Sequence, residues 1–217
     1  MVTLAEELLL LLLDDRTGHL APISRAGLTC GLAGAVLMDL EIRGRICAEA
    51  ACLAVTDPAA TGEPLLDPAL VELAAAPARL DAAAWIRHFA AEGEAFYDEA
   101  LDRLLRRGVL REVCEKFLWV METRRYPIVD DRERKEAKLR LLSILLGTCT
   151  PDAHDVALIN LADVCGIFRL ILRDRELEPA RARIAEVAAL DPIGRATAAV
   201  IQEIEAETQA AAAMLRG

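Results

Sequence analysis

The sequence predicts a mainly α-helical protein whose 217 residues form a single globular domain, residues 1–217. Hydrophobic residues make up 54% of the chain and aromatic residues only 4%, so Leu, Ala, Val and Ile must build the core. This mixture favours helices over sheets, because sheets are rich in aromatic and β-branched residues. No internal repeat or low-complexity linker divides the chain. We therefore expect a buried helical core that is wrapped by amphipathic helices, with a short β-hairpin.

The first helix is predicted from residue 4 to residue 14. Thr3 and Glu6 have the spacing of a capping box, in which each side chain accepts a hydrogen bond from the backbone N–H of the other residue. The leucines from residue 8 to residue 13 make the second half of this helix apolar on every side. Such a pattern is typical of a buried helix.

The second helix begins after Ser24, a favoured N-cap residue, and contains "GLAGAVLMDLEIRGRI", residues 31–46. Gly31 and Gly34 allow a neighbouring helix to approach closely, and apolar positions on all sides indicate burial. Gly44 is expected to end this helix in the left-handed conformation. A short hairpin over residues 45–57 and a polar loop are predicted to follow.

Three later helix starts are marked by a Pro that follows a capping residue. The helices predicted beyond the first two lie near residues 68–76, 81–91, 94–107, 131–146, 152–172 with a break at Gly166, 176–189 and 192–215. The segment "GVLREVCEKFLWVME", residues 108–122, has two apolar runs that flank Glu115 and Lys116. It predicts a β-hairpin with its turn at these two polar residues.

No pattern in the sequence indicates catalysis or metal binding. His19, His88 and His154 lie far apart, without a second His or Cys at a ligand-like spacing. The sequence contains no GxSxG, no HExxH and no glycine-rich phosphate loop. We therefore predict a protein that is not an enzyme and that has no cofactor and no metal site.

The sequence also predicts a cytoplasmic location. Glu6 and Glu7 precede the first leucines, where a secretion signal would carry positive charge. The longest other apolar run, about residues 26–38, is shorter than the ~20 residues of a membrane-spanning helix. The six cysteines have no paired CxxC spacing, and we interpret them as reduced core thiols of a cytosolic protein.

Charge is distributed unevenly along the chain. The net charge of −10 argues against a surface that attracts nucleic acid everywhere, because Lys and Arg provide that attraction. Between residues 103 and 140, however, twelve basic residues stand against seven acidic ones, a local excess of 12 − 7 = +5. This basic segment could face an anionic surface, or it could be an ordinary solvated helix and hairpin.

Apolar residues gather in the second half of the hairpin segment. Phe117, Leu118 and Trp119 are consecutive, so an alternating strand would expose at least one of them unless it meets a membrane or a partner. A helix followed by a hairpin is also the arrangement of a winged-helix DNA binder. We keep that function as a minor alternative.

Several stretches, in this order, resemble the Golgi phosphoprotein 3 family, including its bacterial members. They are "LAEELLLLLLDDRTGHL", "GLAGAVLMDLEIRGRI", "TGEPLLD", "LLRRGVL", "KFLWVMETRRYPIVDDRERKEAKLRLL", "LINLADVCGIF" and "EVAALDP", and they run from about residue 4 to residue 192. The resemblance implies a single, mainly helical domain and a non-enzymatic adaptor. Eukaryotic members bind phosphatidylinositol 4-phosphate at the membrane surface and retain glycosyltransferases in the Golgi. It also implies that Phe117, Leu118 and Trp119 serve membrane insertion or self-association.

The headgroup pocket of the family does not carry over to this sequence. Its Trp position falls at Ser24, or at Ile23 if a gap is placed differently, and the Arg of its "GLRGG" motif falls at Ala33. Its two helical Arg positions fall at Glu94 and Tyr97. Arginine–phosphate bonds are strong and often bidentate, so these changes predict altered or lost lipid specificity.

Two nearby arginines, Arg25 and Arg103, are the candidates for a substitute anion site. The leading functional prediction is a peripheral protein at the inner membrane surface that contacts anionic lipid and an unknown protein partner, without nucleic acid. The alternative is a soluble protein-interaction scaffold that forms homo-oligomers through its hairpin.

Overall fold

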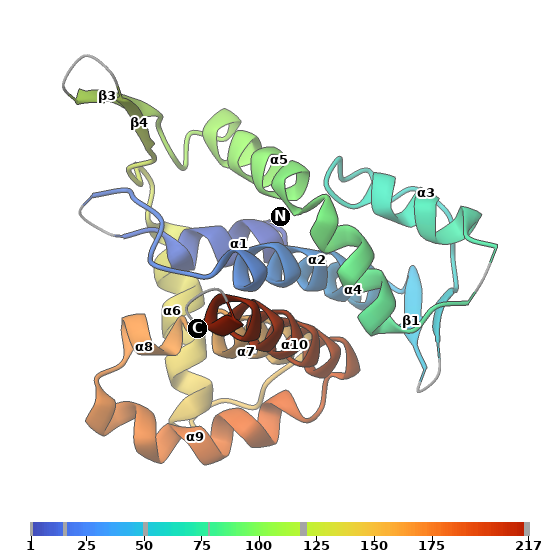
Figure 1. Cartoon of the computed structure of the whole chain (residues 1–217). Helices are drawn as coiled ribbons and strands as arrows, with labels where there is room; N and C mark the ends of the chain where they lie inside the picture. The colour runs from blue at the N-terminus through green and yellow to red at the C-terminus, as the bar shows by residue number, and fades with distance from the viewer. Residues whose placement is uncertain (1, 15–16, 50–51, 78, 118–120, 215–217) are drawn as a thin grey trace.

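A computed structural model describes residues 2–14, 17–49, 52–77, 79–117 and 121–214. These residues form ten helices and two separate two-stranded antiparallel sheets (Figure 1). The elements in chain order are α1 (Leu4–Leu12), α2 (Arg25–Ile42), β1 (Ile46–Ala48), β2 (Leu53–Val55), α3 (Asp67–Ala75), α4 (Ala82–Ala91), α5 (Gly93–Arg106), β3 (Val113–Phe117), β4 (Met121–Arg125), α6 (Arg132–Leu145), α7 (Ala153–Val164), α8 (Phe168–Ile171), α9 (Asp174–Ala188) and α10 (Pro192–Met214). The predicted mainly α-helical single domain is confirmed.

Helix α1 starts where the capping box was predicted. The Thr3 N–H donates to Glu6 Oε2 at 2.8 Å, and the Glu6 N–H donates to Thr3 Oγ1 at 3.3 Å. All residues of α1 except Glu7 are buried, as the leucine run predicts. A second anchor comes from α2, where Asp39 Oδ2 accepts a hydrogen bond from the Leu4 N–H at 2.7 Å.

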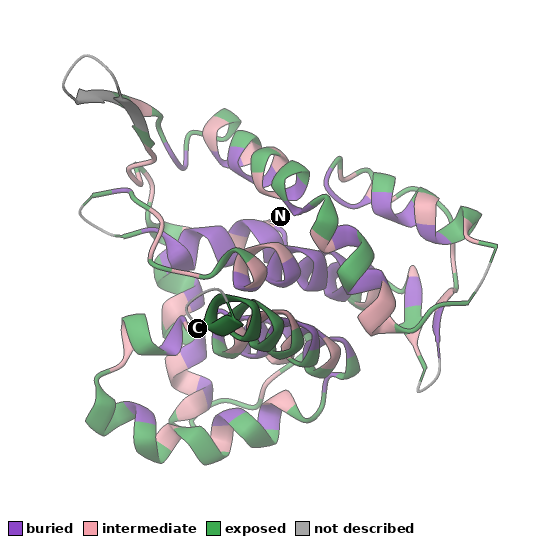
Figure 2. Cartoon of the chain, viewed as in Figure 1, coloured by how far each residue is buried: buried purple, intermediate pink, exposed green. Residues whose placement is uncertain are grey.

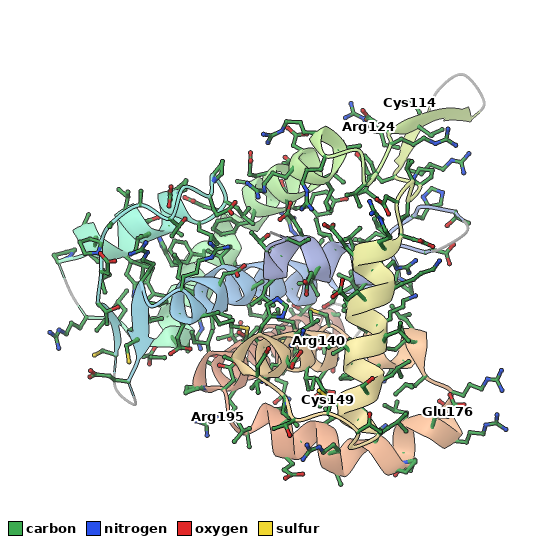
Figure 3. All side chains as sticks on the ribbon, turned by 180° about the vertical axis from the view of Figure 1, so that it is seen from behind. Cys114, Arg124, Arg140, Cys149, Glu176 and Arg195 are labelled. Carbon is green, nitrogen blue, oxygen red and sulfur yellow. The ribbon has the colours of Figure 1, made fainter. Side chains whose placement is uncertain are left out.

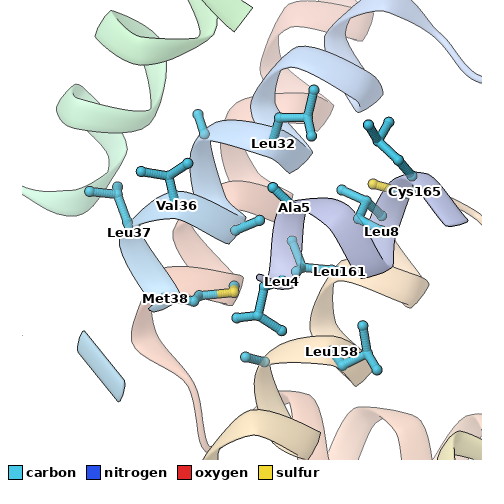
Figure 4. Packing of buried hydrophobic residues seen from close by; sticks show 14 of the residues in the cluster. Leu4, Ala5, Leu8, Leu32, Val36, Leu37, Met38, Leu158, Leu161 and Cys165 are labelled. Carbon is cyan, nitrogen blue, oxygen red and sulfur yellow. The ribbon is translucent and has the colours of Figure 1, made fainter. Parts of the chain in front are cut away.

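Helix α2 lies at the centre of the molecule and contacts α1, α4, α5, α7 and α10. Its glycines allow the close approaches that were predicted. A Cβ at Gly31 would lie 2.6 Å from Cys165 Sγ, and one at Gly34 would lie 2.5 Å from Thr197 Oγ1. Figure 4 shows the apolar side chains of α1 and α2 packed together with those of α7. Gly44, with φ of +67°, ends the helix in the left-handed conformation, as predicted.

The other helices surround this core. Helices α4 and α10 contact each other as well as α2, helices α5 and α7 also pack against α2, and α9 lies outside α7 (Figure 1). Figure 2 shows that buried residues concentrate on α1 and α2 and that the C-terminal half of α10 is exposed. The break predicted at Gly166 separates α7 from α8, and Gly166 has a φ of +70°.

Both predicted hairpins form, but the turn of the second was placed wrongly. Strands β3 and β4 pair with Glu115 opposite Thr123 and Lys116 opposite Glu122, so the pair expected in the turn lies within β3. The hairpin stands away from the helical body (Figure 1), and Glu115 and Lys116 are paired residues of a strand, so their polarity does not mark the turn. Leu118 and Trp119 lie outside the described residues.

The cysteine prediction holds only in part. All six cysteines are free thiols, but only Cys30, Cys52 and Cys165 are buried. Cys47, Cys114 and Cys149 are exposed, which corrects the expectation of core thiols for these three positions.

Within the described residues, no helix is both long enough and apolar enough to cross a membrane.

Candidate functional site

The positions that the resemblance aligns with the family's headgroup pocket lie along the first half of α2 and at the start of α5, two helices that contact each other. Ser24 caps α2 by accepting the Gly27 N–H at 2.9 Å, and its hydroxyl donates to Glu205 Oε1 at 2.6 Å. Ala33 is fully buried and Tyr97 is half-buried. Neither side chain carries a charge that could bind a phosphate group. Glu94 is exposed at the start of α5.

Arg25, the first candidate for a substitute anion site, is paired with Glu94. Its Nη2 atom lies 2.6 Å from Glu94 Oε1, and both side chains are about four-fifths exposed, at 82% and 78%. By the resemblance, this carboxylate stands at one of the positions where the family has an arginine. An exposed pair of this kind exchanges readily with solvent and ions.

Arg103, the second candidate, faces the interior of the molecule. Its Nε atom lies 3.2 Å from Glu6 Oε1, its Nη2 atom lies 2.7 Å from Glu63 Oε2, and its side chain is 13% exposed. Arg107 Nη1 reaches the same Glu6 oxygen at 3.5 Å. The buried Glu6 carboxylate is thus balanced by two guanidinium groups that join α5 to α1.

The two candidate arginines are not brought together. Glu94, the partner of Arg25, precedes Arg103 by nine residues on α5. At a rise of 1.5 Å per residue, this separation is about 14 Å along the helix. Each guanidinium already contacts a carboxylate, so one anion cannot use both arginines in this conformation.

The buried ion pairs continue from Glu63 to α2. Arg43 Nη2 lies 3.8 Å from Glu63 Oε1, and Arg43 Nε lies 4.0 Å from Asp39 Oδ1. Burial raises the pKa of Asp39 to about 6, although the Leu4 N–H and the charge of Arg43 favour the ionised form. These contacts tie α1, α2, α5 and the loop before α3 into one unit.

The excess positive charge of segment 103–140 is spread over several surfaces. Acids outside this segment pair with many of its arginines: Arg103 with Glu6 and Glu63, Arg106 with Glu99, Arg107 with Glu6, and Arg140 with Asp152 and Asp155. Figure 3 shows Arg124 on the hairpin, far along the molecule from Arg140 on α6. The sequence count of +5 therefore overstates the positive charge that any one surface presents.

The hairpin keeps exposed basic residues. Arg111 precedes β3 and is exposed, and Arg124 on β4 is exposed with Nη1 3.4 Å from Glu112 Oε1. Cys114 pairs with Arg124 across the strands. Of the predicted apolar residues, Phe117 is placed at the end of β3, opposite Met121. Arg103 of α5 and Arg107, which caps it, both contact Glu6, and Arg107 also contacts Glu133, so these two arginines before the hairpin are paired with carboxylates of the chain itself.

A cluster that the sequence analysis missed lies at the start of α7. Potential ligand atoms of Asp152, His154 and Asp155 lie within 4.8 Å of one another. The two carboxylates form the capping box of α7, with the Asp155 N–H 2.9 Å from Asp152 Oδ1, and Arg140 contacts both. The guanidinium of Arg140 thus supplies the positive charge that a metal ion would supply. The D-x-H-D spacing is the sequence signal for this cluster.

A cavity of about 660 Å³ lies between the start of α2, the α7–α8 turn, α9 and α10. Its walls combine apolar residues such as Phe168 and Ile184 with Asp163, Arg169 and Arg181. Burial raises the pKa of Asp163, while the charges of the two arginines oppose this effect. The sequence analysis did not find this cavity, because its walls come from segments far apart in the chain.

Comparison with known proteins identifies the family. The sequence profile described as Golgi phosphoprotein 3 (GPP34) matches residues 4–204. The vacuolar protein sorting-associated protein 74 of Eremothecium gossypii is 30% identical over 167 residues, which cover 67% of this chain and 49% of that relative. The chain thus matches about half the length of this curated relative. Taken with the helical fold, the match over nearly the whole chain shows that this protein belongs to the Golgi phosphoprotein 3 family.

Proposed function

We propose that this protein is a non-enzymatic adaptor that binds reversibly to the surface of anionic membranes through the β3–β4 hairpin. The observation that carries this proposal is the hairpin itself, which stands away from the helical body (Figure 1). Arg124 on β4 and Arg111 just before β3 are exposed, and Phe117, Leu118 and Trp119 follow one another in the hairpin sequence. We place the protein in the cytoplasm, at the inner membrane surface.

The energies of such contacts are sufficient for reversible binding. Each basic residue near an anionic bilayer contributes about 1 kcal/mol, and an inserted aromatic residue adds apolar burial. Because many arginines of segment 103–140 are paired elsewhere, the proposal assigns the contact to the hairpin rather than to the whole segment. The net charge of −10 repels an anionic membrane, so the attraction must come from the local positive charge of the hairpin.

The proposal includes altered lipid specificity. Glu94 beside Arg25 would repel a phosphate group, and the buried Ala33 offers no charge. We therefore expect binding to depend on the overall negative charge of the membrane, with little preference for phosphatidylinositol 4-phosphate over phosphatidylserine.

Liposome flotation tests this function. The native chain should float with vesicles that contain phosphatidylserine, whereas Arg124→Glu and Trp119→Ala should each reduce flotation. Arg175→Glu is the matched charge control, because Arg175 is an exposed arginine on α9, away from the hairpin. Equal flotation of all four proteins, or none by the native chain, would overturn the proposal.

The scaffold function remains the second candidate, because β3 and β4 form a sheet of only two strands. A free sheet edge can pair with another chain. If the hairpin joins copies of the chain, light scattering should give a mass above that of the monomer, and replacement of Leu118 and Trp119 by Ser should restore the monomer mass. A native chain that stays monomeric at all concentrations would remove this candidate.

A further inference from the structure

Helix α6 has an inner face and an outer face. Its buried residues, Arg134, Ala137, Leu141 and Ile144, form the inner face, and the helix packs against α1, α7 and α9. Figure 3, which views the molecule from behind, shows α6 in front of the core, with no other helix drawn over it. The outer face is therefore open to solvent in the part of the chain that the structure describes.

A row of leucines lies on this outer face. Leu139, Leu142 and Leu146 have the i, i+3, i+7 spacing of a single helical stripe. Leu139 is 65% exposed, Leu142 is half-buried, and Leu146, which caps the helix, is 77% exposed. Ala137 and Leu141, two positions away on either side, are buried, so Leu139 points away from the core. A contiguous apolar row in solvent is typical of an interaction surface.

The charges beside the leucine row stand mostly before it. Arg132 and Lys135 precede Leu139 on the outer face, and their side chains are 86% and 69% exposed. They contact Asp130 and Asp131 in exposed pairs, which are weak and exchange readily. Residues 141–151, in contrast, contain no charged side chain. The outer face thus begins with cations and ends uncharged.

Antiparallel pairing of two copies fits this pattern. If the two-fold axis passes beside Leu142 and Ser143, Leu139 of one copy faces position 146 of the other. Lys135 then faces position 150, beyond the C-terminal end of the other helix, where the helix dipole favours a cation. Parallel pairing would instead place Lys135 of one copy against Lys135 of the other. The antiparallel contact is self-complementary and closes as a dimer.

A membrane suits this face less well than a second copy does. Arg132, Lys135 and Arg140 all contact carboxylates of the chain itself, so the face offers little net positive charge to anionic lipid. A second copy supplies a matching row of leucines, and the two rows bury each other. Charge and apolar pattern therefore favour the same occupant.

We propose that α6 joins two copies of this chain through an antiparallel contact between their outer faces, centred on Leu142. The leucine rows form the middle of the contact, and Arg132 and Lys135 lie at its two ends. This surface is separate from the β3–β4 hairpin, and the proposal does not depend on membrane binding.

Analytical ultracentrifugation of the full chain tests the contact. The native chain should sediment as a dimer at high concentration and dissociate on dilution. Leu139→Ser and Leu146→Ser should each weaken self-association roughly tenfold or more, because each removes a leucine from both sides of the contact. Both leucines are exposed in the single chain, so the circular dichroism spectrum should not change. Val71→Ser is the matched control, since Val71 is a 68% exposed residue of α3, and self-association should stay as in the native chain.

Cross-linking tests the direction and register of the two helices. The exposed Cys47, Cys114 and Cys149 are first replaced by serine, so that they form no cross-links. In this background, Leu139→Cys mixed with Leu146→Cys should give a disulfide-linked dimer on mild oxidation. Either variant alone should give much less, because the antiparallel register places equal positions apart.

Four results would overturn the proposal. They are a native chain that stays monomeric at all concentrations, self-association that both leucine variants leave unchanged, and cross-linking that is as strong within one variant as in the mixture. The fourth is reduced liposome flotation by Leu139→Ser with unchanged self-association, which would assign the face to a membrane. Self-association that is lost only on Leu118→Ser with Trp119→Ser is an instance of the second result and would assign the dimer to the hairpin.

Discussion

The guanidinium group of Arg103 lies 3.2 Å from Oε1 of Glu6, a carboxylate without exposed surface. This contact joins α5 to α1, whereas the contact of Arg25 with Glu94 lies in solvent. The two arginines that looked equivalent in the sequence therefore have different environments, and their removal should have different effects.

We expect Arg103→Ala to destabilise the fold and Arg25→Ala to have little effect. Loss of one partner of a buried ion pair costs about 3–5 kcal/mol, and the remaining contact of Glu6 with Arg107 favours the lower end. An exposed pair contributes about 0–1 kcal/mol. Urea unfolding measures both values. Similar losses for the two variants would contradict the assignment of Arg103 to the interior.

Glu7 should make the free energy of unfolding depend on pH. Burial, together with the negative charges of Asp39 and Glu133 and against the charge of Arg140, raises the pKa of Glu7 from 4.5 to about 8. Because the folded state holds this proton more tightly, its contribution to stability is full below the unfolded pKa and is lost as the pH rises through about 8.

Glu7→Gln tests this dependence, since glutamine stays neutral. As the pH rises from 6.5 to 8.5, the free energy of unfolding of the variant should increase relative to that of the native chain. His154 and Asp39 change protonation mainly below this range, so they contribute little to the difference. Thermal unfolding across this window measures the difference. A gap between the two proteins that stays constant with pH would show that Glu7 is not the group responsible.

A methyl group at Gly34 should weaken the packing of α2 against α10. Its Cβ would lie 2.5 Å from Thr197 Oγ1, and overpacking of this kind costs about 1–3 kcal/mol. Thr197→Ala removes the clashing atoms, so Gly34→Ala should cost less in that background. Denaturant unfolding of the four proteins gives the coupling energy. A coupling near zero would contradict this close approach.

The exposed thiols should react before the buried ones. Cys47, Cys114 and Cys149 are exposed, and burial raises the pKa of Cys165 to about 12, which suppresses its thiolate. A thiol reagent should therefore modify three cysteines rapidly in the native chain and all six after unfolding. Rapid modification of Cys165 in the native chain, detected by mass spectrometry, would contradict its burial.

Local signals in the sequence were enough to predict most of the fold. The Thr3–Glu6 capping box, the Gly44 helix end and the Asp191–Pro192 helix start all depend on neighbouring residues, and all three form in the structure. The predicted position of the hairpin turn was wrong. Glu115 and Lys116 are polar, but they pair with Thr123 and Glu122 inside the strands, so polarity alone did not mark the turn.

The site could be predicted less well, because it depends on contacts between distant segments. Asp39 lies in an apolar stretch, and nothing near it in sequence indicates its bond to the Leu4 N–H. Likewise, Arg103 looked available for an anion until the fold placed Glu6 and Glu63 beside it. Charge counts along a chain do not reveal such partners.

The separation of the β3–β4 hairpin from the helical body has a consequence for how this protein can diversify. Its strands pair with each other, while the buried core lies in helices such as α1 and α2. Substitutions on the hairpin can therefore change what the protein touches with little loss of folding free energy. Selection can therefore change the residues on the hairpin surface of this fold while its helical core stays unchanged.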